Sequence, residues 1–225
     1  MNYTHGIDIS KYQGQINFKE IEQSHPDIKF CFVKSTDGNS YIDPNFYIHA
    51  KNLESSTIFS GSYHFFQPVN PEQQAEHYYQ KTFDYTQLPP VIDIEKANSN
   101  NSHWELAKSF VEKTEELWNQ ECIIYSYSNF IKSIPINLQD FFSKRKLWVA
   151  IYNNLDEPGN STTSTLNNIK PWKNWTMHQE SGDNAFKLFN KIPTDLNSFN
   201  GELNTFIDTF NLKDKLNKTK DWFNS

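Results

Sequence analysis

Apolar and polar residues alternate along this chain with two different periods, which together predict a succession of strands and helices. Short runs rich in β-branched and aromatic residues predict eight strands, at residues 5–10, 29–36, 58–66, 89–95, 122–127, 147–152, 175–179 and 194–199. Stretches with a helical period separate the earlier strands. The clearest of these begins near Ser102, where apolar residues recur at near-helical spacing, at Trp104, Ala107, Val111 and Trp118.

Capping residues mark where other helices begin. Asn17 and Glu20 have the spacing of a capping box for a short helix. Asp43 and Asn70 each precede a proline, which is the pattern of an N-cap followed by a first-turn proline. These signals predict a short helix after Asn17, a helix over residues 43–53 and another over residues 70–83.

The chain changes character after residue 153. Residues 153–170 are rich in Asn, Ser and Thr without an apolar period and predict a long loop, whereas residues 202–225 predict an amphipathic helix with a break near Asn211. Repeated strand–helix units imply a parallel sheet, and eight strands without a separate second half predict an α/β barrel. We expect one barrel domain over residues 1–201, with residues 202–225 as a helical tail packed on it.

Composition narrows the class of protein. The 225 residues are 16% aromatic, which is too aromatic for a disordered chain. The net charge of -6 and the lack of a block rich in Lys or Arg argue against a nucleic-acid partner. No window has the apolar length of a membrane span, and the first residues lack the pattern of a signal peptide.

Cysteine and histidine spacing gives no sign of a metal site. Cys31 and Cys122 each lie in an apolar, strand-like run, so we expect both to be reduced and buried as small hydrophobic residues. The histidines show no metal-ligand spacing, and His49 and His103 are expected on the surface.

Two acids stand at the end of an otherwise apolar strand, in the run Pro-Pro-Val-Ile-Asp-Ile-Glu of residues 89–95. Side chains alternate faces along a strand, so Asp93 and Glu95 share one face, with Cα atoms roughly 6.6 Å apart at the usual rise. Such a pair splits its pKa values, which lets one acid donate a proton while the other stays ionised. A strand end that reaches solvent explains the same two residues, and this pair alone does not decide between the two interpretations.

Acids elsewhere in the chain favour the functional interpretation. In a barrel of parallel strands, catalytic residues gather at the carboxyl ends of the strands. Asp8 occupies such a position between Ile7 and Ile9, and Asp195 lies in another predicted strand. Three strands therefore carry acids at comparable places, which indicates a shared acidic site.

Six motifs occur in an order that resembles the family 25 glycoside hydrolases, the Chalaropsis-type lysozymes. They are Gly6-Ile-Asp-Ile-Ser-Lys-Tyr-Gln-Gly14, Phe32-Val-Lys-Ser-Thr-Asp-Gly38, Tyr41-Ile-Asp-Pro-Asn-Phe46, Gly61-Ser-Tyr-His-Phe-Phe66, Asp93-Ile-Glu95 and Asp195-Leu-Asn-Ser-Phe199. The resemblance covers about residues 5–200 and implies an irregular TIM-like (β/α)5β3 barrel. It further implies hydrolysis of the β-1,4 bond between N-acetylmuramic acid and N-acetylglucosamine in peptidoglycan, without a metal or organic cofactor.

The same resemblance implies roles for the acids. Glu95 matches the general acid that protonates the leaving oxygen, while Asp8 and Asp195 match acids that line the same groove. Asp93 matches a residue thought to orient the 2-acetamido group of the substrate, whose carbonyl would attack the anomeric carbon. The residues themselves do not choose between this substrate-assisted route and a direct carboxylate nucleophile. A like charge at Asp93 should raise the pKa of Glu95.

Substrate contacts are implied on other strand ends. Tyr63 and Tyr125 match sugar-contacting tyrosines, Lys34 matches a groove lysine, and Tyr41 and Tyr152 are further candidates. The chain departs from the family pattern in its seventh strand, where His178 and Glu180 replace aromatic residues and Glu180 adds a charge near the barrel rim.

Two alternatives stay open at this point. The barrel could be a glycosidase that acts on chitin-like polymers, or a glycan-binding barrel without catalysis. Retention of every expected acid argues against the second alternative. We expect a monomer that acts on the bacterial cell wall, in an extracellular or periplasmic location, by an export route that the first residues do not reveal.

Overall fold

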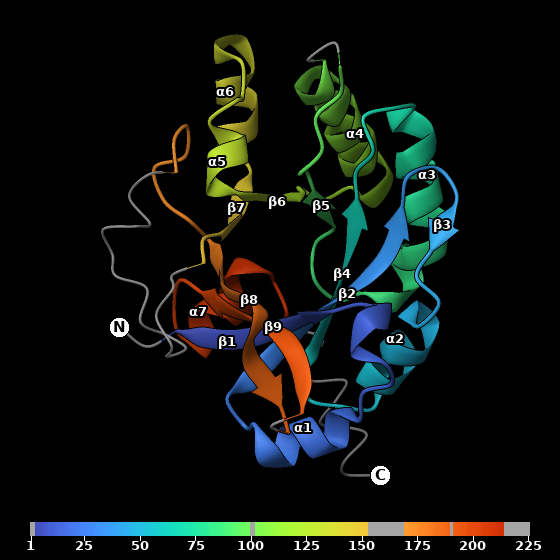
Figure 1. The fold of residues 1–225 in the computed structure, drawn as a ribbon, viewed down its shortest axis with the longest axis vertical. Coiled ribbons are helices and arrows are strands. Elements are labelled where there is room, and N and C mark those ends of the chain that lie inside the picture. The colour runs from blue at the N-terminus through green and yellow to red at the C-terminus, as the bar shows by residue number, and fades with distance from the viewer. Residues whose placement is uncertain (1–2, 100–101, 153–168, 190, 214–225) are drawn as a thin grey trace.

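Eight strands close into a barrel in the computed structural model, which describes residues 3–99, 102–152, 169–189 and 191–213 (Figure 1). In barrel order the strands are β1 (Thr4–Ile9), β2 (Ile28–Asp37), β4 (Phe59–Phe65), β5 (Val91–Asp93), β6 (Ile123–Tyr127), β7 (Lys146–Ala150), β8 (Met177–Leu188) and β9 (Ile192–Phe199). Pairing of β1 with both β2 and β9 completes the ring. The two-residue strand β3 (Tyr41–Ile42) pairs with β2 outside it.

Strand direction divides the barrel into two parts. The barrel strands other than β9 run parallel to one another, whereas β9 is antiparallel to both β8 and β1. Antiparallel neighbours need only a tight turn between them, so β8 and β9 form a long hairpin. This explains why the predicted strand at 175–179 is too short: the observed β8 continues to Leu188.

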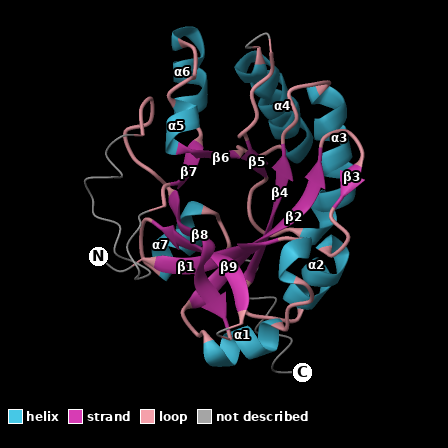
Figure 2. Ribbon diagram, viewed as in Figure 1, coloured by secondary structure: helices cyan, strands magenta, loops and turns pink. Residues whose placement is uncertain are grey.

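Helices follow the first five barrel strands, as the (β/α)5β3 pattern requires (Figure 2). They are α1 (Phe18–Ser24), α2 (Phe46–Glu54), α3 (Pro71–Thr82), α4 (His103–Trp118), and the pair α5 (Ser128–Ile131) and α6 (Ile136–Ser143). Two short 3-10 turns, Lys11–Gln13 and Phe83–Tyr85, complete the connections. Within the described residues no helix lies between β7 and β9, so the predicted fold is confirmed.

Three buried clusters hold the barrel together. One lies between the sheet and helices α3, α4 and α6, and includes Trp104 and Phe142. A second lies under α1, α2 and the β8–β9 hairpin. The third fills the barrel interior with large side chains such as Phe30, Phe32 and Trp148, so the barrel is a packed core rather than a pore.

The last described helix, α7 (Leu203–Thr209), closes one end of that interior. The ring of Phe206 stacks on Phe30 at 5.1 Å between centroids and contacts Phe59 and Phe199. Phe30 and Phe59 lie near the amino ends of their strands, so α7 covers the amino end of the barrel. The helix ends at Thr209, close to the predicted break, and the remainder of the expected tail, residues 214–225, lies outside the described residues.

Some local predictions were wrong. The helix expected from Asp43 begins at Phe46. The buried Asp43 carboxylate accepts hydrogen bonds from the backbone N–H of Lys11, in the turn after β1, and from that of Asn45. His49 and His103, expected on the surface, are buried on the inner faces of α2 and α4. None of the described helices is long and apolar enough to cross a membrane.

Candidate active site

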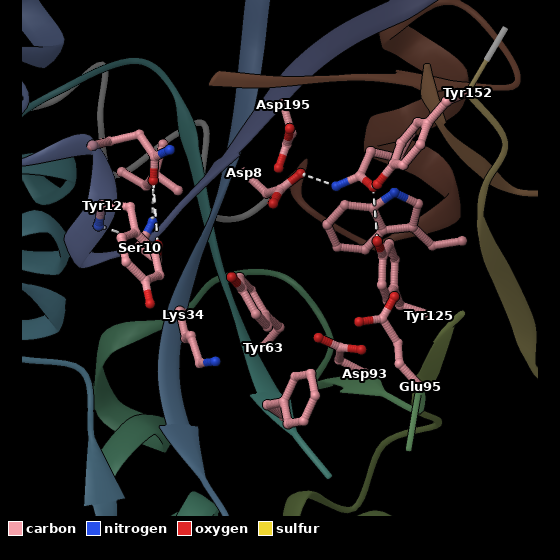
Figure 3. Close-up of a pocket in the computed structure, with 15 residues that line it drawn as sticks. Asp8, Ser10, Tyr12, Lys34, Tyr63, Asp93, Glu95, Tyr125, Tyr152 and Asp195 are labelled. Atoms are coloured by element: carbon pink, nitrogen blue, oxygen red, sulfur yellow. Dashed lines mark hydrogen bonds between the residues drawn. The ribbon is translucent and has the colours of Figure 1, made fainter. Parts of the chain in front are cut away.

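A pocket of about 310 Å³ opens at the carboxyl ends of the parallel strands (Figure 3). Its size lies at the lower end of the range typical of small-molecule sites. Its walls combine carboxylates with aromatic rings and come from strands on every side of the barrel. Because α7 closes the opposite end, this mouth is where the barrel interior meets solvent.

All four acids predicted from the sequence line this pocket: Asp8, Asp93, Glu95 and Asp195. Asp8 comes from β1, Asp93 is the last residue of β5, and Glu95 follows two residues later. The alternation expected along this segment is present, since Ile94 between the two acids is buried in the helix-facing core.

Asp195 lies in the first half of its strand and not, as the strand-end argument assumed, at the carboxyl end. It pairs directly with Asp8 across the antiparallel β1–β9 ladder, in the first half of β9. The carboxyl end of this strand points toward the other end of the barrel, so its early residues are the ones that lie at the mouth. The strand-end argument thus placed Asp195 correctly although β9 runs in the reverse direction.

Asp8 is the centre of a hydrogen-bond network. The amides of Gln179 and Asn197 each donate to Asp8 Oδ2 at 2.8 Å. Asp8 is only 7% exposed, and burial raises its pKa from 3.8 to about 6, although the two amide donors act in the opposite direction.

Gln179 links this aspartate to two tyrosines. Its Oε1 accepts hydrogen bonds from the hydroxyls of Tyr125 and Tyr152, both at 2.7 Å. These two donors orient the amide group so that Nε2 faces Asp8. Gln179 was not predicted as a site residue, although its neighbours His178 and Glu180 were singled out.

Asp93 and Glu95 lie beside this network, since Asp93 pairs with Tyr125 in the β5–β6 ladder, and both acids have raised pKa values. Burial is the main cause for both groups, and the Lys34 ammonium counteracts it. For Glu95 the next cause is the charge of Asp8, while the repulsion expected between Asp93 and Glu95 raises the pKa of Asp93. Asp93 is 5% exposed, and among the described residues its Oδ1 has no hydrogen-bond partner in the protein. That oxygen is free to accept a polar hydrogen from a ligand.

Four of the five predicted substrate contacts also line the pocket: Lys34, Tyr63, Tyr125 and Tyr152. Lys34 Nζ lies 3.5 Å from Asp37 Oδ2 and 4.7 Å from the centroid of the Phe65 ring. Tyr41 is not among the lining residues. It belongs to β3, is 37% exposed, and its ring centroid lies 5.4 Å from Lys11 Nζ.

His178 and Glu180 do not line the pocket either. His178 is buried, and its Nε2 lies 3.0 Å from the carbonyl oxygen of Ile151. Glu180 accepts a hydrogen bond from the Ser198 hydroxyl, which also contacts His5 Nδ1. Across the part of the chain that the structure describes, no group of three or more His, Cys, Asp and Glu side chains is arranged to hold a metal ion.

Comparison with known proteins finds a matching family model and several relatives of this chain. The model of the family described as "Glycosyl hydrolases family 25" matches residues 7–187. The uncharacterized protein YegX of Escherichia coli K12 is 30% identical in an alignment of 220 residues that covers 92% of this chain and 75% of that protein. The N,O-diacetylmuramidase of Chalaropsis sp. is 26% identical over 162 residues, with 64% of this chain and 76% of that protein covered.

Solved structures show the same fold. A bacterial lysozyme from Streptomyces coelicolor superposes with a TM-score of 0.77 at 21% identity, over 94% of this chain and 98% of that one. A family 25 glycosyl hydrolase from Bacillus anthracis gives a TM-score of 0.70 at 24% identity, over 91% and 92% of the two chains. At these identities the likeness establishes the barrel and not its substrate.

Proposed function

Since this chain belongs to the glycosyl hydrolases of family 25, we propose that it is a lysozyme that cleaves the β-1,4 bond between N-acetylmuramic acid and N-acetylglucosamine in peptidoglycan. The observation that carries the proposal is the convergence of Asp8, Asp93, Glu95 and Asp195 on one pocket of a family 25 barrel. A relative that bears the name N,O-diacetylmuramidase supports the substrate class. Such an enzyme acts on the bacterial cell wall.

Glu95 is the proposed general acid. Protonation of the bridging oxygen by a positioned carboxyl group lets the leaving sugar depart as a neutral alcohol. A carboxyl group suits this task when its pKa is raised toward neutral pH, and burial together with the charge of Asp8 shifts Glu95 in that direction. The Lys34 ammonium counteracts the shift, which keeps the carboxyl group able to donate its proton.

Asp93 is proposed to orient the acetamido group beside the breaking bond. Its buried Oδ1 has no partner among the described residues and can accept the acetamido N–H. This hydrogen bond would strengthen the acetamido carbonyl as the internal nucleophile and stabilise the positive charge that develops on it. Direct attack by a carboxylate is the alternative route, and it would make Asp93 the residue bonded to the sugar.

The aromatic residues of the pocket are proposed to hold the sugar rings. Tyr63, Tyr125 and Tyr152 combine apolar faces with hydroxyl groups, which suits sugars because these carry both apolar and polar surface. Gln179 and the two tyrosines bonded to it keep that wall rigid.

Purified peptidoglycan tests the reaction. After digestion, borohydride reduction labels the newly formed reducing ends, and mass spectrometry identifies the products. Reduced muramic acid at those ends supports the proposal, and reduced glucosamine there would refute it. Chitin oligomers are tested in parallel. Cleavage of chitin without cleavage of peptidoglycan would identify a chitin-type glycosidase. Cleavage of neither substrate would identify a barrel without catalysis.

Substitution of the acids tests their roles. Glu95→Gln keeps the shape but removes the proton, so the rate should fall by about two to four orders of magnitude. A substrate with an activated phenolic leaving group needs no such proton and should restore bond breaking in Glu95→Gln much more than in Asp93→Asn. Glu112→Gln, on the exposed face of α4, is the matched control and should keep full activity. Equal rescue of the two pocket variants would contradict these assignments.

A further inference from the structure

One aromatic residue of the pocket wall is almost fully exposed. Tyr12 lines the pocket and is 83% exposed, more than any other tyrosine among the exposed large residues of the described chain. Single exposed apolar residues are common on protein surfaces and by themselves indicate nothing. The surroundings of Tyr12 distinguish it from such residues.

The turn that carries Tyr12 is held on several sides. The backbone N–H of Ser10 donates to the Gln13 side chain at 2.9 Å, and the Ser10 hydroxyl accepts from the Tyr12 N–H at 3.4 Å. The Gln13 amide donates to the carbonyl of Pro193 on β9, and the Lys11 N–H donates to Asp43 at 3.0 Å. An exposed ring on a backbone fixed in this way loses little conformational freedom when it binds a ligand.

Tyr12 lies at the far side of the pocket from the proposed catalytic acid. Figure 3 shows Glu95 at one side and Tyr12 at the other, with Tyr63 and Lys34 between them. A β-1,4-linked glycan is an extended row of rings. A strand with its scissile bond at Glu95 would therefore continue along the pocket and bring another sugar ring to Tyr12.

A positive charge stands next to this ring. Lys11 Nζ lies 5.3 Å from the ring centroid of Tyr12 and 5.4 Å from that of Tyr41, so the ammonium group sits between two tyrosines. The other side of the pocket carries the acids Asp93 and Glu95. An anionic group on the substrate is therefore favoured at the Tyr12 side and disfavoured at the catalytic side.

We propose that Tyr12 and Lys11 form a remote subsite for a sugar of the same glycan strand, beyond the sugars bonded at the cleavage point. Tyr12 stacks on the sugar ring, and Lys11 pairs with a carboxylate carried by the lactyl group or by the peptide attached to it. Lys11 and Tyr41 are not among the lining residues of the pocket; Lys11 is next to the lining residue Tyr12, and Tyr41 supports the lysine. The inference rests on the proposed function, because it takes the peptidoglycan strand as the ligand.

The chain-length dependence of hydrolysis tests the subsite. KM is measured for wild type and Tyr12→Ala on purified glycan strands, from the shortest that is cleaved to strands several disaccharides longer. The ratio of the two KM values should rise about tenfold along the series, since only long strands reach Tyr12. Tyr12→Trp should restore the wild-type dependence on length. Tyr47→Ala, on an exposed tyrosine of α2 outside the pocket, is the control and should follow wild type at every length.

The charge is tested separately. Lys11→Met should raise KM for long strands that carry free carboxylates, and this increase should vanish when the carboxylates have been converted to amides. A KM ratio for Tyr12→Ala that stays constant with length, in an enzyme that cleaves peptidoglycan, would refute the subsite and leave the proposed function intact. Wild-type protein that leaves peptidoglycan uncleaved would refute the proposed function itself.

Discussion

Replacement of Asp8 by asparagine is expected to stabilise the fold above about pH 6. Burial raises the pKa of Asp8 from 3.8 to about 6, so the folded protein holds this proton at a pH where the unfolded chain has released it. The contribution of Asp8 to the free energy of unfolding of the wild type therefore falls as the pH rises from about 4 to about 6. Above that range the ionised, buried carboxylate lowers stability by a constant amount.

The size of the effect follows from the shift. A difference of about two pKa units corresponds to roughly 3 kcal/mol at about 1.4 kcal/mol per unit. Asparagine retains an oxygen that can accept from Gln179 and Asn197, both of which donate to Asp8 Oδ2 at 2.8 Å. It thus resembles the protonated carboxyl group. We expect Asp8→Asn to exceed wild type by about 1–3 kcal/mol at pH 8 and to differ little at pH 4.

Urea unfolding followed by tryptophan fluorescence at pH 4, 5, 6, 7 and 8 measures this difference. Asp140→Asn, which removes an exposed carboxylate on α6, corrects for the loss of one negative charge. Activity on peptidoglycan should fall in Asp8→Asn while stability rises, as expected for a charge kept for function at the expense of stability. If Asp8→Asn is no more stable than wild type at pH 8, buried charge at this position does not strain the fold.

Two further predictions concern buried side chains. Gln179→Leu leaves the buried Tyr125 hydroxyl without its acceptor, so the free energy of unfolding should fall by about 1–3 kcal/mol. The same change removes a donor to Asp8 and so raises the pKa of Asp8, which should move the acidic limb of the pH–rate profile to higher pH. An unmoved profile would contradict the link to Asp8. Cys31 and Cys122 are free, buried, and raised in pKa by burial. A thiol reagent should find no reactive group in the native protein and two in denaturant without reductant, and a count of zero in denaturant would contradict this.

Strand and helix positions could largely be predicted from the sequence, because they depend on local patterns. Apolar periodicity identified all eight barrel strands, and the four apolar residues predicted for the inner face of α4 are buried: Trp104, Ala107, Val111 and Trp118. Alternation along residues 91–95 correctly separated the pocket-facing acids from the core-facing isoleucines. Local signals were less exact where a distant partner intervened, as at Asp43, whose carboxylate also binds the backbone of the turn after β1, while Asn45 is the N-cap of α2.

The candidate site divides in the same way. The residue types and their strand positions singled out Asp8, Asp93, Glu95 and Asp195, because parallel strands bring their carboxyl ends to one side of a barrel. The partners of those acids were not predictable from spacing. Asn197 contacts Asp8 across 189 positions and Gln179 across 171, and both contacts exist only because β9 runs antiparallel and closes the ring onto β1.

The sequence by itself determined which segments become strands and helices, which face of each is apolar, and which acids stand at strand ends, since these properties depend on neighbours in the chain. Only the tertiary structure decided which side chains meet. Closure of the barrel buried Asp8 between two amides and brought Gln179 into contact with two tyrosines. It also placed Tyr12, but not Tyr41, among the residues that line the pocket. Such contacts arise between elements far apart in the chain, and pKa values follow from burial, which no local pattern contains.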